Sequence, residues 1–189
     1  EEQATVMRAF RALDQAVQAE QREAQLSSLL CRVQWQRQTA PPSTHPPTEL
    51  GAWLLLADPA GVAHALAAQL TSAGAEVTLL APGAPLDVSR SWRGVVALHT
   101  LGQPAPTSSA ALMATMEQLL DPLLQLVQQL ATSPGTPPRL WVLTQGAQAV
   151  QPTDRVDPVQ SALWGFGRVV AMEHPELWGG LIDLDPAMD

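Results

Sequence analysis

The chain lacks several of the side chains that most often transfer protons. Its 189 residues include no tyrosine, no lysine and no asparagine, so arginine supplies every permanent positive side-chain charge. Acid–base chemistry that depends on a tyrosine–lysine pair is therefore excluded within this chain. The single cysteine, Cys31, excludes an internal disulfide and a cysteine-based zinc cluster, which fits a reducing compartment.

Positive charge and long apolar runs are also scarce. Ten basic residues oppose 18 acidic ones, which gives a net charge of −8, and the arginines form no basic cluster. Because such a surface repels phosphates, we expect no binding to nucleic acid. No uninterrupted apolar stretch approaches the roughly 18–20 residues of a membrane span, and the Glu-Glu start lacks a signal-peptide pattern. We therefore expect a cytoplasmic protein that does not enter membranes.

The first 28 residues form the first of two expected regions, 1–28 and 29–189. Residues 3–27 are rich in Ala, Gln and Glu and contain neither Pro nor Gly, which favours a helix. Its apolar residues Val6, Phe10, Leu13 and Val17 recur at spacings of four, three and four. This stripe fits either a helix that packs on its own domain or a short seam between two identical chains. Two heptads stabilise little, so any such homodimer is expected to be weak.

The rest of the chain alternates between apolar strands and helices. A short strand is expected at 30–36 and a proline-rich linker at 39–49. The later pattern predicts strands at 52–57, 76–80, 94–98, 139–144 and 180–184, and helices at 59–72, 108–131 and 158–173. Apolar strands that alternate with helices indicate a parallel sheet covered on both faces. We therefore predict an α/β fold: a truncated, Rossmann-like, doubly wound parallel sheet preceded by a helix.

The expected sheet lacks the features of a dinucleotide site. The first strand–helix turn, 57–62, has Gly61 as its only glycine, and Asp58 places a carboxylate where a diphosphate would bind. The second strand runs into Ala81 without the acid or arginine that would hold a ribose or its phosphate. We predict that this fold binds no cofactor.

Other polar residues near strand ends give no stronger candidate. Thr144 is expected to cap a turn, and His99 merits attention because it ends a strand. Asp183 and Asp185 are interpreted as exposed carboxylates at a domain edge. No histidine is paired with Cys, Asp or Glu at ligand spacing, so no metal site is expected. We therefore assign no catalytic, cofactor-binding or metal-binding residue.

The C-terminal segment carries the most specific pattern. Asp157 or Thr153 is expected to cap a helix that begins at Pro158. Gly165 and Gly167 lower the helix propensity, which suggests close packing of the helix backbone against another element. The whole stretch SALWGFGRVVAMEHPELWGGLIDLD closely resembles the end of the structural subdomain of ketoreductases in modular type I polyketide synthases. Three earlier stretches resemble that subdomain in the same order: LLCRVQWQ (29–36), GAWLLLADPAGVAHALAAQLTSAGAEVTLL (51–80) and RLWVLTQGAQAV (139–150).

The resemblance implies a structural role. Such ketoreductases have two Rossmann-like halves, and the catalytic half carries the NADPH site and the residues that reduce the β-keto group of a carrier-bound polyketide. This chain is similar to the other, non-catalytic half, so no catalytic residue transfers to it. Its expected partners are the catalytic subdomain and neighbouring synthase domains. Candidate interface residues are Val6, Phe10, Leu13, Val17, Trp35, Trp164, Arg168 and Trp178. The position and character of the N-terminal helix resemble those of helices that dimerise before some ketoreductases.

Two other functions remain open. One is a pseudo-ketoreductase scaffold, without reductase activity, beside a methyltransferase or an enoylreductase. The other is an independent Rossmann domain that binds a small molecule such as an acyl group or a nucleotide. A glycine-rich loop of the NADPH-binding type downstream would favour the reductase half over the scaffold. The missing phosphate turn argues against the small-molecule domain.

Overall fold

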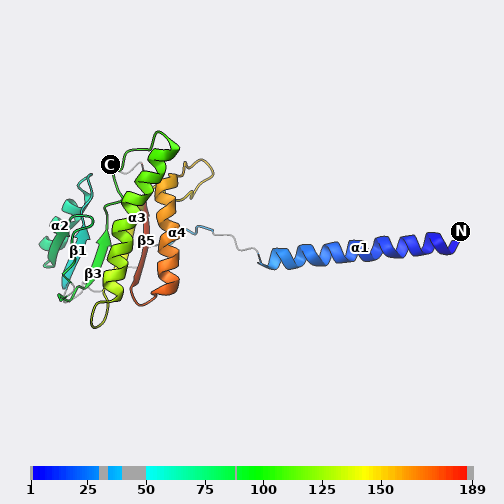
Figure 1. Ribbon diagram of the computed structural model, residues 1–189, viewed down its shortest axis with the longest axis horizontal. Coiled ribbons are helices and arrows are strands. Elements are labelled where there is room, and N and C mark those ends of the chain that lie inside the picture. The colour runs from blue at the N-terminus through cyan, green and yellow to red at the C-terminus, as the bar shows by residue number, and fades with distance from the viewer. Residues whose placement is uncertain (1, 30–33, 40–49, 88, 187–189) are drawn as a thin grey trace. The chain divides into compact units, whose positions relative to one another are not determined.

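The chain forms two compact units, residues 1–42 and 43–189, in a computed structural model that describes residues 2–29, 34–39, 50–87 and 89–186 (Figure 1). The first unit contains helix α1 (Glu2–Leu29), as expected from the composition. Leu13 and Val17 on this helix are 64% and 45% exposed. The side chains of Val6 and Phe10 lie outside the described part of α1.

The prediction of a strand at 30–36 is wrong for residues 34–36, the part of it that the structure describes. Residues 34–39 have no regular secondary structure, and residues 30–33 lie outside the described part of the chain. Alternation of polar and apolar residues predicts a strand only where a neighbouring strand can accept its hydrogen bonds. Most of the linker expected at 39–49 is likewise outside the described residues.

The second unit is the predicted parallel α/β sheet. Its elements are β1 (Ala52–Leu56), α2 (Val62–Ser72), β2 (Glu76–Leu80), β3 (Gly94–Ala97), α3 (Ser109–Ala131), β4 (Arg139–Gln145), α4 (Pro158–Glu173) and β5 (Trp178–Leu184). The five strands run parallel in the order β2-β1-β3-β4-β5. This arrangement confirms the Rossmann-like fold class. It is truncated because the connection from β2 to β3 contains no helix among its described residues.

The two faces of the sheet are covered unequally. Leu54, Val95 and Val142 share a core cluster with residues of α3 and α4, which lie side by side over the sheet in Figure 1. Leu55 and Val96, the next residues along their strands, belong to a smaller cluster with residues of α2. Because neighbouring residues of a strand point to opposite faces, α2 covers one face and the α3–α4 pair covers the other.

Two tryptophans cover part of the sheet face on the α2 side. The rings of Trp53 on β1 and Trp141 on β4 have centroids 5.6 Å apart, although β3 separates the two strands. They meet above Gly94 of β3, where a Cβ atom would lie 2.6 Å from each ring. Trp141 also lies against Gly179 of β5, at an irregularity in the β4–β5 pairing. These glycines leave room for the large rings to lie against the sheet.

Candidate functional site

The carboxyl ends of β1 and β3 mark the place where a Rossmann fold binds its ligand. The strand order reverses between them, and such a switch point opens a crevice in most sheets of this kind. Here the crevice begins with the turn from β1 into α2. Gly61 precedes the first residue of α2 with φ = 85°, a left-handed conformation that favours glycine. The backbone thus explains this glycine without a phosphate.

Asp58 occupies the helix N-terminus that would otherwise face a diphosphate. Its side chain is buried, and its two oxygens accept hydrogen bonds from the backbone N–H groups of Val62 (3.0 Å) and Ala63 (2.6 Å). The first two free donors of α2 are therefore already satisfied by a negative group. The sequence predicts that this helix begins at Pro59, but it begins at Val62. Residues 58–61 instead form the turn that brings the Asp58 carboxylate to the N-terminus of the helix.

The opposite wall of the crevice lies against this turn. Gly102, in the loop after β3, approaches Ala60 so closely that an added Cβ would lie 2.8 Å from the Ala60 Cβ. The backbone of the loop after β3 therefore lies against the turn that precedes α2. At the switch point, the N-terminus of α2 is capped by Asp58 and this loop packs on the turn.

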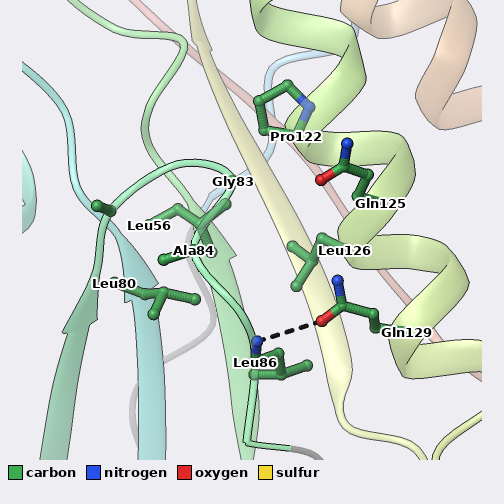
Figure 2. Close-up of a pocket in the computed structure, with 10 residues that line it drawn as sticks. Leu56, Leu80, Gly83, Ala84, Leu86, Pro122, Gln125, Leu126 and Gln129 are labelled. Atoms are coloured by element: carbon green, nitrogen blue, oxygen red, sulfur yellow. Dashed lines mark hydrogen bonds between the residues drawn. The ribbon is translucent and has the colours of Figure 1, made fainter.

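A small hollow lies near the end of β2. It is lined by Leu56 and Leu80, by the loop at 81–86 and by one side of α3, including Gln125 and Gln129 (Figure 2). The Oε1 atom of Gln129 accepts a hydrogen bond from the backbone N–H of Leu86 at 3.2 Å and ties the loop to the helix. Its volume of about 10 Å³ is close to the space of one water molecule, so the hollow suits no organic ligand.

His99, at the end of β3, is only 2% exposed. Its Nε2 atom lies 3.0 Å from the carbonyl oxygen of Leu119, while Nδ1 has no hydrogen-bond partner among the described residues. Burial lowers the pKa of His99 below its ordinary 6.5. The neutral ring fits a packing role between β3 and α3.

This shift predicts how stability depends on pH. Near pH 6.5 the unfolded chain binds a proton at residue 99 that the folded chain rejects, so the free energy of unfolding falls as pH decreases below about 6.5. One such group contributes at most about 1.4 kcal/mol per pH unit. Urea unfolding at pH 7.5, 6.5 and 5.5 measures this slope. The His99→Gln variant should have a smaller slope than the wild type.

A hydrogen-bond network gathers at the carboxyl ends of β4 and β5. The Thr144 hydroxyl donates to Asp183 Oδ1 at 2.8 Å and accepts from the indole N–H of Trp164 at 2.8 Å. Asp183 also accepts from the backbone N–H groups of Ala147 and Gln148, each at 3.0 Å. The interpretation of Asp183 as an exposed edge carboxylate is therefore wrong. It fastens the loop after β4 to β5, and Thr144 links it to α4 instead of capping a turn.

The expected close packing of the α4 glycines is confirmed for Gly167 only. A Cβ there would lie 2.8 Å from the Trp178 ring and 3.0 Å from Leu181, so the helix backbone rests on β5. Around Gly165 an added Cβ would meet nothing within 4 Å. Among the residues that the structure describes, the expected close packing at Gly165 is therefore wrong. The expected cap is present: Asp157 accepts from the N–H groups of Val159 and Gln160.

The candidate interface residues are divided between the two units. Trp164 and Trp178 are half-buried within the C-terminal motif, while Arg168 is exposed on α4. Leu13, Val17 and Trp35 are exposed in the first unit. Across the described ranges, no group of three or more His, Cys, Asp or Glu side chains is placed to hold a metal ion. No helix in the same ranges is long and apolar enough to cross a membrane.

Comparison with known proteins places this arrangement in a family. Residues 33–189 match the family model of the Rossmann fold domain of the polyketide synthase extender module SpnB. The chain belongs to this family. The match includes the whole sheet. The resemblance to the structural subdomain of modular ketoreductases is thereby confirmed.

Individual relatives agree with this SpnB-type assignment. The chain is 37% identical over 152 residues to the polyketide synthase GfsA of Streptomyces halstedii, covering 71% of this chain and 2% of that protein. It is 36% identical over 140 residues to the pikromycin polyketide synthase component PikAIII of Streptomyces venezuelae, covering 74% of this chain and 8% of that protein. The chain therefore spans less than a tenth of either synthase.

Solved ketoreductases share the fold. A C2-type ketoreductase from a modular polyketide synthase superposes with a TM-score of 0.52 at 33% identity over 74% of this chain. An A-type ketoreductase gives 0.53 at 29% identity over 75% of the chain. The matched part is 33% and 32% of those two chains. The SpnB-type domain thus matches about a third of each of those two chains.

Proposed function

We propose that this SpnB-type domain is the non-catalytic structural half of a polyketide synthase ketoreductase. In this role it braces a catalytic half that reduces the β-keto group of a carrier-bound polyketide with NADPH. The observation that carries the proposal is the closed switch-point crevice, in which Asp58 caps α2 and Gly102 contacts Ala60. The absence of tyrosine, lysine and asparagine from the sequence supports it independently.

The proposal predicts that the isolated chain does not bind NADPH. Titration up to about 1 mM, followed by intrinsic tryptophan fluorescence and by calorimetry, should give no saturable signal, because Asp58 already accepts the first two backbone N–H groups of α2. A complete ketoreductase such as the A-type protein serves as the positive control. Saturation in the micromolar range would contradict the proposal and make the turn at 57–62 a cofactor site.

We further propose that α1 pairs weakly with a second copy through Val6, Phe10, Leu13 and Val17. The exposure of Leu13 and Val17 supports this pairing. Because two heptads stabilise little, the dissociation constant should lie between about 0.1 and 1 mM. Sedimentation equilibrium should show association of the wild type that the Leu13→Glu/Val17→Glu double variant abolishes. Gln15→Glu, off the stripe, should leave association intact, and a wild type monomeric at 1 mM would refute the pairing.

A further inference from the structure

A second and larger hollow opens at the edge of the sheet where β3 and β4 begin, opposite the switch point. Its volume is about 270 Å³, and its lining comes from the loops before these two strands and from the last turn of α3. This space is far larger than one water molecule needs and lies near the lower end of the range for organic ligands. It therefore suits a small organic molecule.

Buried apolar residues and one charged residue line this hollow. Trp92, Leu130 and Pro138 belong to the lining and are buried. Across the lining, Arg90 is the only charged residue that the structure describes. A ligand that complements these side chains has an apolar body and one negatively charged group.

Arg90 is held in place from two sides. Its Nη2 atom pairs with a carboxylate oxygen of Glu76 at the start of β2, and its guanidinium carbon lies 4.6 Å from the centroid of the Trp92 ring. The Trp92 indole N–H donates in turn to the carbonyl oxygen of Asp87 at 3.2 Å. Because a guanidinium has five N–H donors, the pair with Glu76 leaves others available to a ligand. Holding the guanidinium in advance also lowers the entropic cost of binding.

Two hydroxyl groups add further donors. Ser91 and Thr136 line the hollow, and neither side chain forms a hydrogen bond with a described residue. The last carbonyl groups of α3 would oppose an anion, but they already accept hydrogen bonds from the hydroxyls of Thr132 and Ser133. Arg90 and the two free hydroxyls thus form a set of donors that matches an oxyanion.

We propose that this hollow binds a small amphipathic oxyanion, either a carboxylate or a phosphate monoester, that carries a short alkyl chain. The charged oxygens pair with Arg90 and accept hydrogen bonds from Ser91 and Thr136. The alkyl chain lies against the buried apolar residues of the lining. The inference does not depend on the proposed function, because the hollow and the switch-point crevice lie at opposite edges of the sheet.

Titration of the full chain, labelled with ¹⁵N, with hexanoate and with hexyl phosphate tests the site. The NMR signal of the Trp92 indole N–H should shift along a saturable curve for at least one probe, with a dissociation constant of about 1–20 mM. Tighter binding of hexanoate identifies a carboxylate ligand, and tighter binding of hexyl phosphate identifies a phosphate monoester. Arg90→Gln should weaken the tighter probe at least about tenfold, because it removes a charge-assisted pair. Thr136→Val, at an exposed position away from the Glu76 pair, should weaken it about threefold.

Matched controls separate this site from general effects of charge and apolar contact. Arg93→Gln removes the same charge from an exposed arginine outside the lining, and it should retain the wild-type affinity. Hexan-1-ol has the alkyl chain without the charge and should bind at least about tenfold more weakly than the tighter probe. Equal affinities of Arg90→Gln and the wild type, or equal losses in Arg90→Gln and Arg93→Gln, would overturn the proposal. The same holds if the Trp92 signal shows no saturable shift up to about 50 mM of either probe.

Discussion

Asp183→Ala should destabilise the chain by about 3 kcal/mol, because the carboxylate accepts two backbone N–H groups and one hydroxyl at once. Alanine leaves these donors unpaired within the fold and releases the loop after β4 from β5. The substitution also frees Thr144, which holds the indole of Trp164 on α4. Urea unfolding followed by circular dichroism at neutral pH measures the change in the free energy of unfolding.

Two further variants test whether the hydrogen bonds cause this loss. Asp183→Asn should be affected less, because the amide oxygen still accepts from one or two donors. Glu173→Ala, which removes an exposed carboxylate near the end of α4, should change stability by less than about 0.5 kcal/mol. If Asp183→Ala were as stable as the wild type, Asp183 would be an edge carboxylate after all.

Gly179→Ala is the second substitution with a large expected effect, again about 3 kcal/mol of destabilisation. The new methyl group would lie 2.6 Å from two atoms of the Trp141 ring and 2.8 Å from the carbonyl oxygen of Leu140. The ring is held by Trp53 and the oxygen belongs to the backbone of β4, so neither moves away easily. Urea unfolding of the purified variant and of the wild type measures this difference in the free energy of unfolding.

Gly165→Ala is the matched control for this clash, since it adds the same methyl group where nothing lies within 4 Å. It should stabilise the isolated chain by up to about 1 kcal/mol through helix propensity alone. The two alanine substitutions should therefore change the free energy of unfolding in opposite directions, and the two variants should differ by about 4 kcal/mol. Equal effects would mean that Trp141 does not lie against Gly179.

The sheet was predictable because most of its strands are short apolar runs, of which β3 is buried at every position. Runs such as 52–56 and 94–97 are recognisable locally, and turns with Gly or Pro separate them from the helices. The expected strand at 30–36 depended on alternation alone, which does not specify a pairing partner. The start of α2 was misplaced because Asp58 acts as a cap from four residues away, beyond the usual spacing.

The site was predictable in part. The poor match of the turn at 57–62 to a phosphate loop was visible in the sequence, but its closure by Gly102 was not, because the two segments are about forty residues apart. The same limit explains Asp183. Its partner Thr144 lies 39 residues away and was interpreted separately. Gly165 and Gly167 both lower the helix propensity of α4, so the sequence does not distinguish them. Only the position of β5 shows that Gly167 is closely packed and that Gly165 is open.

The pair of indoles above Gly94 gives this fold an optical property of its own. Two tilted chromophores 5.6 Å apart share their electronic excitation, which produces a paired positive and negative band in circular dichroism. Trp53 and Trp141 come from strands that are not neighbours, so the bands arise only after β3 has taken its place between them. During refolding, their appearance would therefore time the completion of the central sheet without any added label.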